Sequence, residues 1–261
     1  MRIATTCLLW LMAGTTVATQ AGPAGSAPAV AARPALDQAP PAARVGEHRY
    51  DVGGVRLWYR VAGQRTGTPV VVLHGGPGEG SQTFARFAGP ALETRLRMVY
   101  LDQRGSGRSD RPKDAKYYSI PLLVDDIEAL RRQLGAPRID LIGHSFGTIL
   151  ALEYGARYPE RVAHIVLAAA VPDLPRMIDI QCARLQEHDK AAFARAAQGK
   201  RPGAYPRCDI FRAYAGERLS AMIHRNMYPR PEIGREVDGT DAAGGLGNSG
   251  ELSGALIDKG L

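Results

Sequence analysis

Residues 139–147, with the sequence IDLIGHSFG, decide the fold of this chain. Residues 139–142 are predicted to form a short strand, and residues 146–158 have the composition of a helix. Between them lies GHSFG (143–147), a G-x-S-x-G pattern that joins a strand to a helix. Glycines two positions before and after the serine let the strand and helix approach closely. The pattern therefore predicts a sharp turn that holds Ser145 at the edge of a sheet as a candidate nucleophile.

Continuous apolar runs occur elsewhere in the chain, at 70–73 and 98–101, and a further strand is predicted at 162–167. Continuous runs of this length are typical of strands buried on both faces of a parallel sheet. Before them, 50–59 predicts a hairpin that turns at Gly53 and Gly54.

A helix is predicted over 119–134, because Ser119 can cap it, Pro121 lies in its first turn and Gly135 ends it. Strands that alternate with helices in this way predict an α/β fold with a mostly parallel sheet.

The composition along the chain divides it into four segments. Residues 1–21 have a positive start, a short apolar core and small residues, which predicts a secretory signal peptide; a disordered tail is the alternative. Residues 22–45 are rich in Ala and Pro, which predicts a flexible linker. Residues 46–172 form the predicted core, and 173–261 resemble a helical lid in which the chain ends before the remaining core strands. We expect a secreted or periplasmic protein without a stable membrane anchor.

Export would leave Cys182 and Cys208 in an oxidising compartment. We therefore predict a disulfide between Cys182 and Cys208, with two unrelated thiols as the alternative.

The composition excludes several classes of protein. The chain has 261 residues, of which 45% are hydrophobic and 23% charged, so it is neither disordered throughout nor collagen-like. The formal net charge is +7, but the basic residues are scattered among acidic ones. Because there is no basic run, zinc-finger spacing or RNA-binding signature, we do not expect a nucleic-acid partner.

A second motif, HGGPG (74–78), follows the strand 70–73 directly. Acyl transfer needs two N–H donors for the oxyanion, and the residue after the nucleophile, Phe146, supplies one. The loop after the earlier strand supplies the other, for which we predict Gly76. A tight turn without a ligand is the alternative. We expect His74 and His144 to pack in the structure rather than to act as bases.

A third segment, DQRGSGRS (102–109), contains G-x-G but not G-x-G-x-x-G, which disfavours a dinucleotide or phosphate site. We expect this loop to shape the scaffold, with Asp102 and Arg104 holding it through charge-assisted hydrogen bonds.

Together the three motifs resemble the α/β-hydrolase family, in particular its proline iminopeptidase branch (S33 peptidases), over residues 48–172. The resemblance implies that Ser145 is the nucleophile and that Gly76 and Phe146 form the oxyanion hole. It also implies small ester, amide or short-peptide substrates, and neither a cofactor nor a metal ion. The implied function is that of a secreted serine hydrolase that forms an acyl-enzyme.

Two features of the sequence depart from that branch. Iminopeptidases carry a segment with tryptophan and glutamate in the lid, whereas the tryptophans here are Trp10 and Trp58. Glu187, Glu217 and Glu232 are acids in the predicted lid, but nothing in the sequence places them at an amine-binding site. A proline iminopeptidase-type aminopeptidase and a related esterase therefore both remain open.

The family order is serine, acid, histidine, with the last two after later strands. The candidates for these roles after Ser145 are Asp173, His164, His188 and His224. Asp173 follows the predicted strand 162–167 and could be the acid in an unusual arrangement. His164 lies within that strand, and His188 and His224 lie in lid-like sequence without a strand before them. A non-catalytic protein on a hydrolase scaffold is therefore the alternative function.

Overall fold

The computed structural model describes residues 43–197, 230–243, 252 and 254–256. The predicted signal peptide, most of the predicted linker and much of the predicted lid, including residues 198–229, lie outside the described residues.

A mixed sheet of six strands forms the centre of the described fold, in the order β1-β2-β4-β3-β5-β6. The strands are β1 (Gly46–Val52), β2 (Val55–Gly63), β3 (Pro69–Leu73), β4 (Arg97–Asp102), β5 (Ile139–His144) and β6 (Val162–Ala168). The β1–β2 and β2–β4 pairs are antiparallel, and the β4–β3, β3–β5 and β5–β6 pairs are parallel. This topology confirms the predicted α/β class with a mostly parallel sheet.

The central strands bury both faces, as their continuous apolar runs predicted. In β3, Val71 and Leu73 join the larger core cluster, whereas Val70 and Val72 join the smaller cluster on the opposite face. This alternation follows from the two-residue period of a strand.

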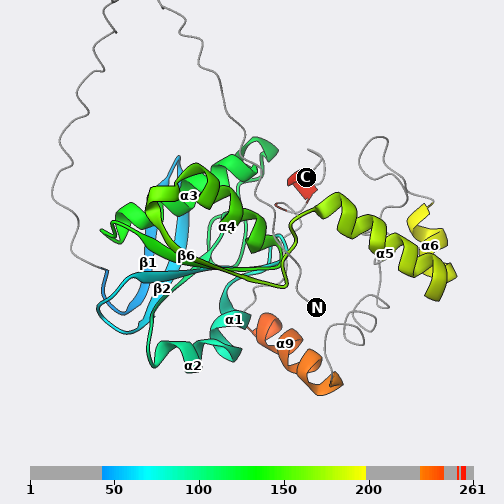
Figure 1. Ribbon diagram of the computed structural model, residues 1–261, viewed down its shortest axis with the longest axis horizontal. Helices are drawn as coiled ribbons and strands as arrows, with labels where there is room; N and C mark the ends of the chain where they lie inside the picture. Colours follow the sequence, from blue (N-terminus) through cyan, green and yellow to red (C-terminus); the bar gives the residue numbers. More distant parts are fainter. Residues whose placement is uncertain (1–42, 198–229, 244–251, 253, 257–261) are drawn as a thin grey trace, which may run out of the picture. The chain divides into compact units, whose positions relative to one another are not determined.

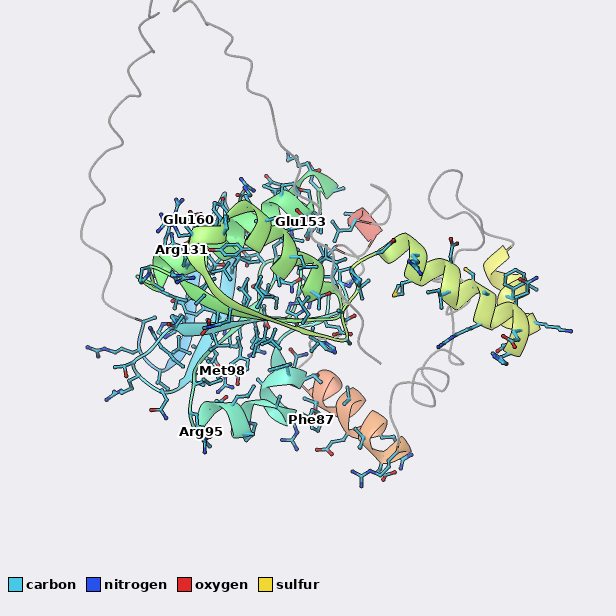
Figure 2. All side chains as sticks on the ribbon, in the orientation of Figure 1. Phe87, Arg95, Met98, Arg131, Glu153 and Glu160 are labelled. Carbon is cyan, nitrogen blue, oxygen red and sulfur yellow. The ribbon has the colours of Figure 1, made fainter. Side chains whose placement is uncertain are left out.

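Helices cover both faces of the sheet (Figure 1). The helices α3 (Ile120–Gln133) and α4 (Phe146–Arg157) pack over the larger cluster, and α1 (Gln82–Phe87) and α2 (Gly89–Glu93) border the smaller one. Figure 2 shows Arg131 of α3 and Met98 of β4 on opposite sides of the sheet.

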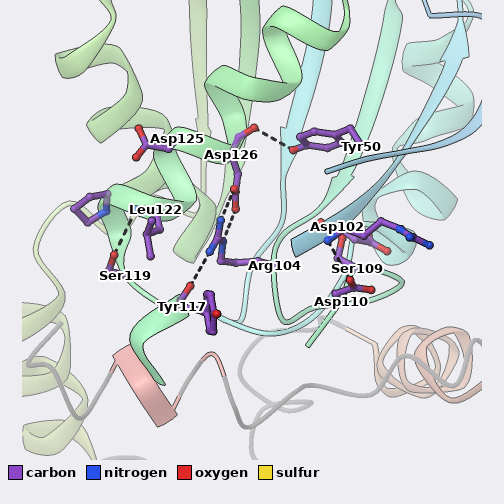
Figure 3. Close-up of polar contacts among 12 residues, drawn as sticks. Tyr50, Asp102, Arg104, Ser109, Asp110, Tyr117, Ser119, Leu122, Asp125 and Asp126 are labelled. Carbon is purple, nitrogen blue, oxygen red and sulfur yellow. Dashed lines mark hydrogen bonds and ion pairs between the residues drawn. The ribbon is translucent and has the colours of Figure 1, made fainter. Parts of the chain in front are cut away.

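The two long core helices begin where the sequence predicted. Ser119 caps α3, because its hydroxyl accepts a hydrogen bond from the Leu122 N–H at 3.4 Å (Figure 3). Gly135, at φ +61°, follows the end of α3. The hairpin is longer than predicted, since β2 continues to Gly63 through its pairing with β4.

The structure also contains short elements that the sequence did not reveal. Helix α1 has no buried residues, so it lacks the apolar stripe that makes a helix recognisable from sequence. Two 3-10 turns, η1 (Ala115–Tyr117) and η2 (Pro159–Arg161), connect larger elements.

Beyond the sheet the described elements are helical: α5 (Leu174–His188), α6 (Lys190–Ala197) and α9 (Pro231–Ala243). Leu252, Ala255 and Leu256 are buried in the same core cluster as α3 and α4. Among the described helices, none has the length and apolar character needed to cross a membrane.

In the described part of the chain, β6 has a neighbour on one side only. Val166 and Leu167 on this strand are 55% and 39% exposed. An edge strand that exposes large apolar side chains is a favourable surface for further pairing.

Candidate active site

Ser145 lies at the turn between β5 and α4 in an unusual backbone conformation. Its φ is +50° and its ψ is −118°, a region that residues with a side chain rarely adopt. The backbone is held there from both sides: the Ser145 N–H donates to the Ala168 carbonyl at 2.9 Å, and the Thr148 hydroxyl donates to the Ser145 carbonyl at 2.6 Å. A strained residue that is held so firmly is characteristic of functional sites.

The two glycines of the motif allow three elements to meet at this turn. A methyl group at Gly143 would lie 2.6 Å from the Gly147 carbonyl oxygen. One at Gly147 would lie 2.6 Å from the carbonyl carbon of Leu73, at the end of β3. Real side-chain carbons do not come so close, so both positions require glycine for β5, α4 and β3 to pack as they do.

The HGGPG loop lies against the Ser145 turn. A methyl group at Gly75 would lie 3.2 Å from the Ser145 Cβ. Gly76, the next residue, has φ +109° and is exposed, whereas Phe146 is the first residue of α4. The structure thus brings the loop that contains Gly76, the Ser145 turn and the N-terminus of α4 together at one end of the parallel strands.

His74 is buried and ties this loop to the segment that follows β4. Its Nε2 accepts a hydrogen bond from the Gln103 N–H at 3.0 Å, so its Nδ1 carries the proton and donates to the Gly75 carbonyl at 2.9 Å. Burial lowers the pKa of His74, and this outweighs the opposing effect of Asp102. Both ring nitrogens of His74 therefore form hydrogen bonds with backbone groups, in agreement with the packing role expected for this residue.

Asp102 organises the loop that follows β4. Its Oδ1 accepts hydrogen bonds from the Ser81 N–H at 2.8 Å and the Ser81 hydroxyl at 2.6 Å. Its Oδ2 accepts one from the Arg108 N–H at 2.8 Å and forms an ion pair with the Arg108 guanidinium at 3.0 Å. This buried carboxylate links the start of α1 to the 102–109 loop.

Arg104 anchors the same loop to α3 (Figure 3). Its guanidinium donates two hydrogen bonds of 2.6 Å to the Asp126 carboxylate, and the two side chains are only 3% and 1% exposed. Burial raises the pKa of Asp126 to about 6 against the opposing effect of Arg104. The contacts of Asp102 and Arg104 confirm the scaffold role predicted for this loop.

The described acid and histidine candidates have partners elsewhere. His164 on β6 is 83% exposed and lies 2.8 Å from the Asp140 carboxylate, and His188 pairs with Glu187 at 3.4 Å. The Asp173 carboxylate accepts a hydrogen bond from the Arg176 N–H at 2.9 Å, which caps α5. His224 lies outside the described residues.

Cys182 is fully buried and disulfide-bonded. Its predicted partner, Cys208, lies outside the described residues, so the pairing stays a prediction. No group of three or more residues that could hold a metal ion occurs in the part of the chain that the structure describes.

A cavity of about 460 Å³ lies apart from Ser145, next to α1 and α2. Side chains that line this cavity pair with one another: Arg60 forms an ion pair with Glu93 at 3.0 Å, and the Arg108 guanidinium lies 3.6 Å from the centre of the Trp58 ring. None of Ser145, Gly76 and Phe146 lines it.

Glu79 was missed by reasoning from sequence. Its carboxylate oxygen Oε2 lies 3.2 Å from the position that a methyl group at Gly75 would occupy. The Ser145 Cβ lies 3.2 Å from that same position. The one hint was its place directly after HGGPG, in a loop already predicted to meet Ser145.

The mixed sheet covered by helices and the sharp turn at Ser145 between β5 and α4 are those of an α/β hydrolase. The family model described as the alpha/beta hydrolase fold matches residues 68–205, and the chain belongs to that family.

The curated relatives with similar sequences are proline iminopeptidases. That of Lactiplantibacillus plantarum is 38% identical over 121 residues, which cover 45% of this chain and 42% of that protein. That of Xylella fastidiosa (strain 9a5c) is 42% identical over 113 residues, which cover 43% of this chain and 35% of that protein. The chain thus spans less than half the length of these relatives.

Solved structures have the same fold. A proline iminopeptidase-related protein from Thermus thermophilus is 28% identical, with a TM-score of 0.67, over 84% of this chain and 73% of that one. The epoxide hydrolase VrEH1 from Vigna radiata is 23% identical, with a TM-score of 0.55, over 83% of this chain and 73% of that one, and shows the fold alone.

Proposed function

We propose that this protein is a serine hydrolase in which Ser145 is the nucleophile and the N–H groups of Gly76 and Phe146 form the oxyanion hole. The observation that carries the proposal is the Ser145 backbone at φ +50°, with Gly75 of the HGGPG loop so near that a methyl group on it would lie 3.2 Å from the Ser145 Cβ. Strain of this kind persists only where surrounding structure imposes it.

In the proposed reaction, the Ser145 hydroxyl oxygen attacks the substrate carbonyl carbon and its proton passes to a general base. The carbonyl oxygen becomes an oxyanion that accepts hydrogen bonds from the two backbone N–H groups. Collapse of this intermediate breaks the bond to the alcohol or amine, which leaves with a proton and yields an acyl-enzyme. Water then hydrolyses the acyl-enzyme and restores the serine.

The proposed substrates are small esters, amides or short peptides. The proline iminopeptidases among the relatives favour an aminopeptidase as the more specific proposal. Labelling by a fluorophosphonate probe tests the nucleophile. We expect the full chain to react and Ser145→Ala not to react, and Ser119→Ala, which removes a hydroxyl at the start of α3, to react like the unaltered chain. Equal labelling of Ser145→Ala would refute the assignment.

One observation favours a non-catalytic binding protein as a second candidate. In the described part of the chain, His164 pairs with Asp140 and His188 pairs with Glu187, and no hydrogen bond joins either histidine to Ser145. A serine without a base is a weak nucleophile. A folded chain that hydrolyses neither short-chain nitrophenyl esters nor amino-acid anilides would support this candidate, and turnover that depends on Ser145 would reject it.

We further propose that the protein is exported, with residues 1–21 as the signal peptide and a disulfide between Cys182 and Cys208. The disulfide bond at Cys182 supports this proposal, because such bonds persist in oxidising compartments. The mass of the mature protein tests cleavage, and titration of thiols in the denatured, unreduced protein tests the pairing. Two free thiols would reject it.

A further inference from the structure

The hydroxyl of Thr148 joins the Ser145 turn to the segment that follows β6. It donates a hydrogen bond to the Ser145 carbonyl at 2.6 Å and accepts one from the Val171 N–H at 3.0 Å. A hydroxyl has a single hydrogen to donate, and here that hydrogen goes to the backbone of the candidate nucleophile. Thr148 is buried, which strengthens both hydrogen bonds because the surroundings exclude water.

A second contact holds the same segment to the turn. The Ala168 carbonyl, at the end of β6, accepts a hydrogen bond from the Ser145 N–H at 2.9 Å. The next residue, Ala169, has a φ of +50°. Among the described residues other than glycine, Ser145 and Ala169 are the two with a positive φ. The hydrogen bonds of Ser145 and Thr148 therefore close a ring that contains both strained residues.

The Thr148 hydroxyl is the one side-chain member of this ring. Strain at Ser145 and Ala169 persists only because neighbouring groups hold the backbone in place. The direction of the Ser145 side chain follows from that backbone, so a group that holds the Ser145 carbonyl also fixes where the hydroxyl of the nucleophile points. A shift of about 1 Å in a reacting group can lower a rate by about a hundredfold.

The segment on the other side of the ring leads into the predicted lid. Residues 169–173 connect β6 to α5, and Val171 lies in the middle of this connection (Figure 1). A displacement of this connection acts on Thr148 through the Val171 N–H, and through Thr148 on the Ser145 carbonyl.

We propose that Thr148 is a positioning residue for the serine nucleophile, and that its hydroxyl couples the alignment of Ser145 to residues 169–173 at the start of α5. This inference rests on the proposed function and deepens it, because it assigns a route by which the lid side of the site regulates the nucleophile.

Thr148→Val removes the hydroxyl at nearly constant volume, and Thr148→Ser keeps it. Fluorophosphonate labelling of the full chain over a range of probe concentrations separates the rate of the covalent step from the affinity for the probe. We expect Thr148→Val to slow the covalent step by roughly ten- to a hundredfold at unchanged affinity, and Thr148→Ser to restore most of the rate. Thr94→Val is the matched control and should react like the unaltered chain, because the exposed Thr94 hydroxyl also donates to a backbone carbonyl, that of Ala91, at 2.7 Å.

Amide hydrogen exchange followed by NMR tests the coupling without any labelling. Relative to the amides of α3, we expect the Ser145 and Val171 N–H groups to exchange several-fold faster in Thr148→Val, as the loss of a hydrogen bond predicts. Val171→Pro removes the N–H donor and leaves α4 unaltered, so it should accelerate exchange at Ser145 even if Thr148→Val does not fold.

Two results would overturn the inference: an unchanged Ser145 amide in Thr148→Val or Val171→Pro, or a covalent step in Thr148→Val as fast as in the unaltered chain. Absence of labelling in every variant, the unaltered chain included, would count against the proposed function alone. The exchange of the Ser145 amide then decides whether Thr148 couples the two segments.

Discussion

Replacing Ser145 by glycine and by alanine separates the role of its hydroxyl from that of its backbone. Both variants lose the hydroxyl, but only Ser145→Gly loses the Cβ that makes φ +50° and ψ −118° costly. Such a conformation costs a non-glycine residue about 1–3 kcal/mol. Glycine loses about 0.5–1 kcal/mol more backbone entropy on folding. We therefore expect the unfolding free energy of Ser145→Gly to exceed that of Ser145→Ala by about 1 kcal/mol.

Urea denaturation followed by circular dichroism measures this difference, which corresponds to a melting temperature roughly 2–4 °C higher. Ala169 provides an independent comparison, because it also has a φ of +50°, so Ala169→Gly should stabilise the protein. At exposed Ala170, whose φ is not positive, the same change should destabilise it. If Ser145→Ala is as stable as Ser145→Gly, the turn is unstrained and the reasoning behind the candidate nucleophile fails.

Three further predictions concern the surrounding scaffold. Gly147→Ala should lower the unfolding free energy by about 1–3 kcal/mol and abolish probe labelling, because the added methyl group overlaps the end of β3. Gly239→Ala is the control: nothing lies near this position on α9, so the change should not destabilise the protein. Arg104→Met should cost about 3–5 kcal/mol by leaving Asp126 buried without its ion pair, and adding Asp126→Leu should recover part of that loss in denaturant titrations. Burial acts to raise the pKa of Glu128, but hydrogen bonds from basic and tyrosine side chains outweigh it and lower the pKa from 4.5 to about 2. The stability that this residue contributes should therefore be complete above about pH 4.5 and be lost as the pH falls toward 2, and Glu128→Gln should show a weaker dependence in that range.

Local signals explain what could be predicted of the fold. The capping serine, early proline and terminal glycine of α3 act within a few residues of one another, so its bounds follow from sequence. The continuous apolar runs of β3 and β4 indicate burial on both faces without reference to the rest of the chain. Helices α1 and α2 carry no such signal, because both are short and depend on tertiary contacts: α1 contacts α2 and α9, and α2 contacts β2 and β4.

The sequence by itself determined the strand–turn–helix around Ser145, because the G-x-S-x-G pattern and the strand and helix residues beside it lie in one short stretch of the chain. Only the tertiary structure showed that Gly147 must also leave room for Leu73 at the end of β3. It also determined that charged residues hold the 102–109 loop, but not which partners they take. Only the tertiary structure decided that Arg104 pairs with Asp126 and that Glu79 lies beside Ser145. These contacts join residues far apart in the chain, and their distances depend on how the strands and helices pack, which no local pattern of residues encodes.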